Sequence, residues 1–155
     1  MILVREAQAA DAEVMVRFNA AMAFETETLR LDEDCLRRGV LAVLADHAKG
    51  RYFLAEAESR IVGQTLVTYE WSDWRHGFWW WIQSVYVVPD YRRRGVFSAL
   101  YRHVQSAAET QGALGLRLYV EEQNLPAQET YLNLGMRASH YRMFEIPFDS
   151  EPRLP

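Results

Sequence analysis

The sequence predicts a mixed α/β domain in which helices and strands follow one another along a single chain. Three observations lead to this fold class. Apolar residues recur at helical spacing in some segments and form short alternating or continuous runs in others. Glycine, proline and capping residues separate these segments. In the second half, a strand, a helix and another strand follow in order, which is the pattern of a crossover connection.

The first half of the chain is expected to form a strand, two helices and two more strands. Asp11 can cap the first helix, and Asp32 can open the second helix with an acidic first turn. A tight turn at Ser59 and Arg60 is expected to join the two later strands. The expected strands cover residues 2–7, 52–57 and 61–69, and the expected helices run from 11 to 23 and from 32 to 44.

The second half begins with an almost charge-free strand over residues 78–88, which is typical of a strand buried on both faces. A helix follows, with Gly112 as its C-terminal stop. The remaining expected elements are a strand at 114–120, a short helix from Pro126 to about Gly135, and a final strand at 136–148.

Length and composition limit the classes of protein that this chain can represent. Its 155 residues suit one domain, expected to cover 1–155, and no repeat or linker divides them. A net charge of −4 disfavours a general nucleic-acid binder. The longest uncharged apolar stretch, 13 residues at 77–89, is too short to cross a membrane, and residues 1–6 do not resemble a signal peptide.

Cysteine and histidine usage adds two further expectations. A single cysteine indicates a reducing compartment, so a cytoplasmic protein is expected. Four isolated histidines without paired spacing predict no metal site.

A basic turn between a strand and a helix is the most informative segment. Arg92, Arg93 and Arg94 precede Gly95, and residues 91–108 contain four arginines and no acid. The first turn of a helix has unpaired N–H groups and partial positive charge, so it can bind phosphate. Arginines add charge-assisted contacts to phosphate oxygens. A solvated basic turn is the alternative.

A second segment places Asn124 between a strand and a helix, where an N-cap is expected. Ala127 and Tyr131 are four residues apart and therefore share a helix face. By themselves, these residues are typical of a helix cap and a core tyrosine.

Together the two segments resemble the GNAT superfamily of N-acetyltransferases. Residues 92–97 follow its Arg/Gln-x-x-Gly-x-Gly/Ala pattern after a strand, except that Phe97 stands where a small residue is usual. The second part of the pattern is carried by Asn124, Ala127, Tyr131, Gly135 and Met136. The resemblance implies a central, mostly antiparallel twisted sheet flanked by helices, with a splayed pair of strands holding the cofactor.

The resemblance also implies roles for individual residues. Acetyl-CoA would be the acyl donor, with its pyrophosphate in the turn before the helix, and Tyr131 would protonate the departing thiolate. The implied cofactor-binding residues are Val85, Tyr86, Val87, Arg92, Arg93, Arg94, Gly95, Val96, Phe97, Ser98, Asn124 and Tyr131. The general base stays open among Glu70, Glu121, Glu122 and a water chain held by Gln83 or Ser84.

The acceptor side has an acidic loop and a tryptophan cluster. All five tryptophans fall within residues 71–81, and consecutive tryptophans on a strand must face both sides. The cluster suits an acceptor pocket, a core or a homodimer interface. The candidate acceptor residues are Glu25, Glu27, Trp71, Trp80 and Gln83.

The expected function is transfer of an acetyl group from acetyl-CoA to a primary amine of a small molecule or peptide. No nucleophile is placed for a covalent intermediate, so direct transfer in a ternary complex is expected. The alternative is a non-catalytic sensor or assembly module that binds CoA or an acyl-CoA. Neither a nucleic acid nor a membrane is expected as a partner.

Overall fold

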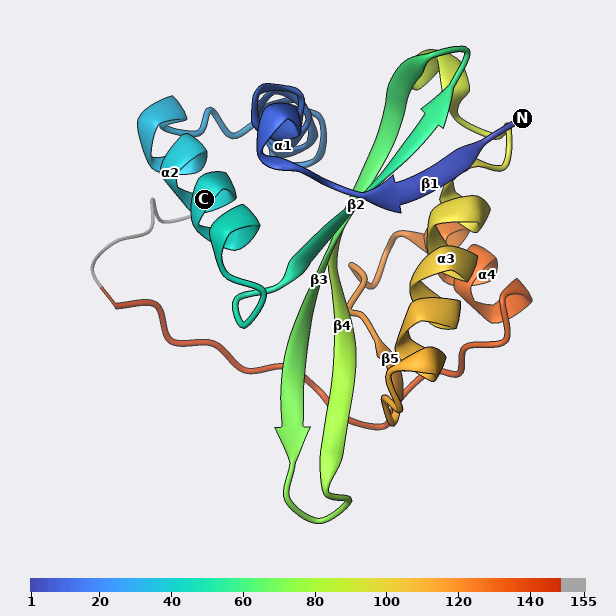
Figure 1. Ribbon diagram of the computed structural model, residues 1–155. Helices are drawn as coiled ribbons and strands as arrows, with labels where there is room; N and C mark the ends of the chain where they lie inside the picture. Colours follow the sequence, from blue (N-terminus) through green and yellow to red (C-terminus); the bar gives the residue numbers. More distant parts are fainter. Residues whose placement is uncertain (149–155) are drawn as a thin grey trace. The chain divides into compact units, whose positions relative to one another are not determined.

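The computed structural model describes residues 1–148. They belong to two compact units, the first formed by residues 1–119 and the second beginning at Val120. The unit formed by residues 1–119 contains a five-stranded sheet with helices on both faces (Figure 1). This is the mixed α/β architecture predicted from the sequence. The expectation of one domain over 1–155 stays a prediction.

The strands lie in the sheet in the order in which they occur in the chain. Neighbouring strands in the first four positions are antiparallel, whereas the fifth is parallel to the fourth. The strands are β1 (Leu3–Glu6), β2 (Arg51–Ala57), β3 (Arg60–Ser72), β4 (Gly77–Val87) and β5 (Gly115–Arg117). The turn between β2 and β3 uses Glu58 and Ser59, both with positive φ, and not Ser59 and Arg60 as expected.

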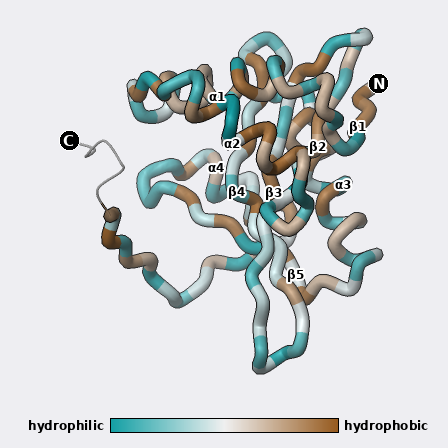
Figure 2. Tube along the Cα trace, turned by 60° about the vertical axis from the view of Figure 1, so that its left-hand side comes forward, coloured by the Kyte–Doolittle hydropathy of each residue, from teal (hydrophilic) through white to brown (hydrophobic). Residues whose placement is uncertain are grey.

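The hydrophobic core on one face of the sheet lies under helices α1 (Ala12–Glu27) and α2 (Glu33–Ala45). Met15 of α1 and Val40 of α2 are buried in one cluster with Tyr52 and Leu54 of β2. Side chains alternate along a strand, so Phe53 points to the opposite face. Figure 2 shows hydrophobic residues gathered near β1 and β2, while the tip of the β3–β4 hairpin is paler and more hydrophilic.

Helix α3 (Val96–Thr110) covers the second face. The ring of His103 lies 5.2 Å from that of Phe53. Val96 and Leu100 approach the backbone at Gly63 so closely that a Cβ there would lie 2.9 Å from Val96 Cγ1. This contact ties the first turn of α3 to the middle of the sheet.

A bulge in β4 and the early end of its ladder with β5 shape the edge of β4 that faces β5. Leu66 pairs with Ser84 and Val67 with Ile82, so Gln83 is an extra residue that forms a bulge. The β4–β5 ladder covers only three residues on each strand and ends at Trp81 and Arg117. Beyond that point the two strands no longer pair, which is the splayed arrangement expected for a strand pair that holds a cofactor.

The second unit contains helix α4 (Leu125–Asn133). Asn124 caps it by accepting a hydrogen bond from the Ala127 N–H at 3.2 Å. The chain leaves the helix at Gly135, whose φ is +89°.

The expected final strand at 136–148 is wrong, because none of these residues belongs to a strand. A strand requires a partner edge, and the described residues provide no ladder for this segment. The strand expected at 114–120 is shorter than predicted, with only Gly115–Arg117 in a ladder. Residues 1–148 include no helix with the length and apolar character needed to cross a membrane.

Candidate active site

The connection from β4 to α3 builds the candidate phosphate site. A short 3-10 turn, η2 (Pro89–Tyr91), follows β4, and Gly95 then caps α3 with φ +82°. The first intrahelical hydrogen bond runs from the Ala99 N–H to the Gly95 carbonyl at 3.0 Å, so the helix begins directly after this glycine. A Cβ at Gly95 would meet no atom within 4 Å, which leaves the backbone open to a ligand on that side.

The three arginines of the turn differ in their partners. Arg92 donates from Nε to the Val87 carbonyl at 2.9 Å and forms an ion pair with Glu25. Arg94 lies with its guanidinium carbon 5.2 Å from the ring centre of Tyr91. Within residues 1–148, Arg93 and Arg94 make no ion pair with an acidic side chain, so their charge is available to an anion.

The ion pair of Arg92 joins the last turn of α1 to the arginine-rich turn after β4. Tyr86 donates from its hydroxyl to Glu25 Oε1 at 3.1 Å, and Arg92 also lies over the Tyr86 ring. The hydrogen bond from Arg92 lowers the pKa of Glu25 below its usual 4.5. Burial, together with that carboxylate, raises the pKa of Tyr86. Glu25 therefore contacts two predicted cofactor residues, whereas Glu27 is exposed at the end of α1.

Phe97 is the residue that departs from the GNAT pattern. Its ring centre lies 6.2 Å from that of Tyr101, one helical turn later. The ring therefore extends along α3, which leaves the Gly95 side of the first turn open.

The end of β4 offers backbone groups beside this turn. Val85, Tyr86 and Val87 pair with β3 on one side. On the other side, the ladder with β5 has already ended at Trp81. The backbone groups that face the splay are therefore not used by strand pairing within residues 1–119.

The second unit carries Asn124 and Tyr131, the other two predicted cofactor residues. Asn124 is exposed and its side chain caps α4. Burial raises the pKa of Tyr131 above its usual 10, so its hydroxyl keeps its proton at neutral pH. Glu121 and Glu122, two of the acids considered as general base, are exposed in the same unit.

The remaining acceptor candidates lie in two places. Gln83, at the bulge, donates to Thr68 Oγ1 at 2.7 Å and accepts from the Tyr119 hydroxyl at 3.3 Å. Trp71 and Trp80 instead line a cavity of about 440 Å³ near the far end of the β3–β4 hairpin.

Sequence reasoning missed a polar cluster at the point where β4 and β5 separate. Arg117 donates to Glu70 Oε1 at 3.0 Å, and the Trp81 indole N–H donates to the same carboxylate. The Arg117 guanidinium also lies 4.0 Å from the ring centre of Trp79. The available signal was that Arg117 is the sole charged residue in the expected strand at 114–120.

Comparisons with known proteins agree with this arrangement. A family model described as the acetyltransferase (GNAT) family matches residues 13–136. A crystal structure of a possible acetyltransferase from Clostridium difficile 630 is 42% identical, with a TM-score of 0.88 over 96% of this chain and 98% of that one. An aminoglycoside N-acetyltransferase in complex with CoA shares the fold, with 16% identity and a TM-score of 0.78 over 95% of each chain.

A curated relative adds a partial match. The thialysine N-epsilon-acetyltransferase of Bos taurus is 33% identical over 75 residues, which are 48% of this chain and 44% of that protein. The match thus spans less than half of the relative's length.

Proposed function

Because the chain belongs to the GNAT acetyltransferase family, we propose that it transfers the acetyl group of acetyl-CoA to a primary amine of a small molecule or peptide. Family membership implies acyl transfer from acetyl-CoA, and the amine acceptor is our proposal. One structural observation supports this proposal most directly. An arginine-rich turn after β4 opens α3 at Gly95, a glycine with positive φ and open space beside its backbone.

The residues of the first unit fit the phosphate end of acetyl-CoA. This donor supplies an acetyl group activated as a thioester. We assign the pyrophosphate to Arg93, Arg94 and the N–H groups of residues 95–98, because a helix N-terminus and arginines both favour anions. Arg92 belongs to the same turn. There Glu25 and a phosphate group would compete for its guanidinium. The open edge of residues 85–87 would hydrogen-bond to the pantetheine arm.

The second unit supplies two further roles in the proposal. Asn124 would hold the cofactor arm, and Tyr131 would donate its proton to the departing thiolate. A tyrosine whose pKa is raised by burial suits a donor, since it stays protonated at neutral pH.

We propose direct transfer from acetyl-CoA to the amine in a ternary complex. The single cysteine, Cys35, lies in the first turn of α2, an element that contributes no residue to the proposed cofactor site. Alignment of two bound reactants can contribute about 7–11 kcal/mol to lowering the barrier.

Glu70 is better suited to positioning than to proton removal in this scheme. Its two oxygens already accept hydrogen bonds from Arg117 and from the Trp81 indole. We assign it the role of holding these two side chains at the point where β4 and β5 separate.

A release assay tests the proposed function. Acetyl-CoA is incubated with a polyamine, an amino acid, an aminoglycoside and a peptide N-terminus in turn, and free CoA thiol is measured. Amine-dependent thiol release is expected. Stabilisation of the fold by CoA without release for any amine would support the alternative, a non-catalytic CoA sensor. That alternative is favoured by the absence of an acid in β4.

The role of Tyr131 has its own test. We expect Tyr131→Phe to keep CoA affinity and to lower turnover about 100-fold, the size of a typical general-acid contribution. Unchanged turnover in this variant, with chemistry shown to be rate-limiting, would remove Tyr131 from the acid role.

Two broader expectations complete the proposal. The single cysteine supports a cytoplasmic location. The exposed aromatic tip of the β3–β4 hairpin, where Trp74 is 95% exposed, supports a homodimer. Sedimentation of the wild type and of Trp74→Ser would detect a dimer formed through this tip.

A further inference from the structure

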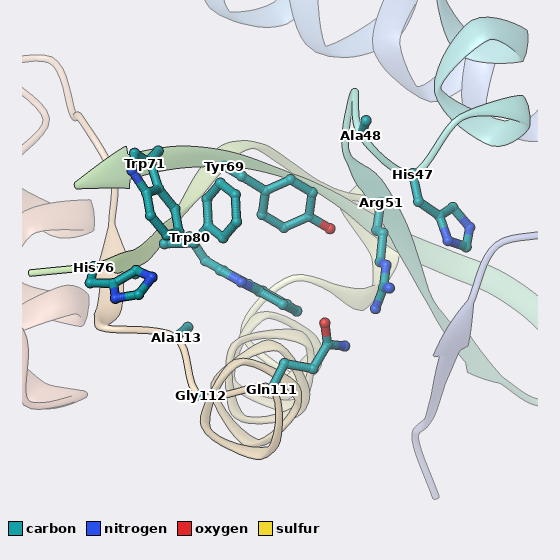
Figure 3. Close-up of a pocket in the computed structure, with 12 residues that line it drawn as sticks. His47, Ala48, Arg51, Tyr69, Trp71, His76, Trp80, Gln111, Gly112 and Ala113 are labelled. Carbon is teal, nitrogen blue, oxygen red and sulfur yellow. The ribbon is translucent and has the colours of Figure 1, made fainter. Parts of the chain in front are cut away.

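A cavity at the far end of the sheet lies apart from the proposed acetyl-CoA turn. Its walls come from the start of β2, the paired ends of β3 and β4, and the residues that follow α3 (Figure 3). Gly95 lies at the opposite end of α3, and 15 helical residues span about 22 Å. At about 440 Å³, the cavity is in the size range of small-molecule sites.

Aromatic rings form the apolar wall of this cavity. The ring centres of Tyr69 and Trp80 are 5.3 Å apart, and those of Trp71 and Phe78 are 4.8 Å apart, both in edge-to-face contact. Trp80 is only 3% exposed and is fixed by packing, whereas Trp71 is 50% exposed and can contact a ligand. Such a wall offers flat, rigid faces to a planar apolar group.

Arg51 gives the cavity its charge. Its Nε is buried and has no hydrogen-bond partner, although the side chain as a whole is 23% exposed. The nearest acid, Glu6, keeps its Oε1 atom 3.9 Å from Arg51 Nε and 3.2 Å from His47 Nε2. Glu6 is thus within ion-pair distance of Arg51 but makes no hydrogen bond to Nε, so the guanidinium keeps unused donors.

The other polar groups around the cavity favour an anion. In Figure 3 the Tyr69 hydroxyl points toward Arg51, and Gln111 reaches up from the end of α3. Two histidines are part of the lining, and no aspartate or glutamate is. A cationic amine would meet the charge of Arg51, so this cavity does not suit the acceptor of the proposed transfer.

We propose that this cavity binds a small aromatic carboxylate, with its ring against Trp71 and Tyr69 and its carboxylate on Arg51. Arginine pairs with carboxylates through two parallel hydrogen bonds, which the exposed part of the Arg51 guanidinium would supply. Trp71 and Trp80 then serve a second ligand site. The site is separate from acetyl transfer and does not depend on it.

Binding of three matched compounds tests the charge preference. Phenylacetate, phenylacetamide and phenethylamine share one ring and carry charges of about −1, 0 and +1 at neutral pH. Titration calorimetry with the full chain, without acetyl-CoA, is expected to show phenylacetate binding at least tenfold more tightly than the amide, and the amine most weakly. Saturating CoA should leave phenylacetate binding unchanged.

Two variants and one control assign the binding to the cavity. Arg51→Gln is expected to reduce phenylacetate affinity to that of the amide, whereas Arg102→Gln, on the exposed side of α3, should have no effect. Ala113→Phe places a ring in the cavity and leaves Arg51 unchanged in sequence, so it should abolish binding. Thermal unfolding of each variant verifies that it is folded. Equal binding of all three compounds, no binding at 10 mM, displacement by CoA, or unchanged affinity in folded Arg51→Gln or Ala113→Phe would each overturn the proposal.

Discussion

Comparing Gly95→Asp with Gly95→Asn tests whether a negative charge at the start of α3 weakens CoA binding. The two variants change the backbone at this position in a similar way, so their difference reports the charge. Asparagine and aspartate tolerate the left-handed region better than other L residues, and a Cβ at Gly95 has open space around it. Both substitutions therefore carry a similar strain at φ +82°. They differ by a single negative charge at the start of α3.

The expected effects on stability and on CoA binding have opposite signs. A carboxylate at the positive end of a helix stabilises it by about 0.3–1 kcal/mol, so Gly95→Asp should be at least as stable as Gly95→Asn. Beside a pyrophosphate, the same carboxylate meets two negative charges. At about 4 Å in water, each repulsion is about 1 kcal/mol, which weakens CoA binding about thirtyfold in total.

Titration calorimetry with CoA and chemical unfolding measure the two effects on the same samples. Salt screens the repulsion, so the difference between the variants should shrink at about 0.5 M salt. If Gly95→Asp and Gly95→Asn bind CoA equally at low salt, this turn does not hold the pyrophosphate.

Three further predictions concern the framework around the site. Gly63→Ala should lower the free energy of unfolding by about 1–3 kcal/mol and weaken CoA binding, because its Cβ would press on Val96 at the start of α3; unfolding and calorimetry measure both, and unchanged values would contradict the tight packing. Asn19→Ala should cost about 3 kcal/mol in urea unfolding, because the buried Gln64 amide loses its partner at 2.8 Å; a loss below about 1 kcal/mol would argue against this bond. The hydrogen bond from Arg5 lowers the pKa of Asp11 below 3.8, so its stabilisation is present above that pH and is lost as the pH falls further. The thermal midpoint should therefore fall more steeply below pH 4 in the wild type than in Asp11→Asn, and parallel curves would refute this.

Features that depend on neighbouring residues could be predicted from the sequence. Asp32 accepts from the Cys35 N–H at 2.6 Å, and Asn124 caps α4, as their positions before helical segments indicate. Gly95 adopts the positive φ that a glycine at a strand-to-helix turn permits. Hydrophobic spacing located the helices and most strands, because that spacing reports local burial directly.

Contacts between residues far apart in the chain could not be predicted from the sequence. Glu25 pairs with Arg92, 67 residues away, so a residue expected at the acceptor lies against the turn that we assign to the cofactor. Arg117 and Glu70 meet only because β3, β4 and β5 lie side by side. The positions of charged residues in the sequence do not reveal these two ion pairs, since any acid could pair with any arginine.

The alternation of apolar residues in 136–148 predicted a strand that the described chain does not form. Alternation makes a segment suitable for a sheet, but a strand exists only where another strand supplies hydrogen-bond partners. The cavity at Arg51 also could not be predicted from the sequence. Its lining comes from β2, the β3–β4 hairpin and the end of α3, which come together only in the folded chain. The sequence therefore indicated the order of elements as far as α4 and the arginine-rich turn that opens α3, because both are local features. Which distant side chains come together depended on the folded chain.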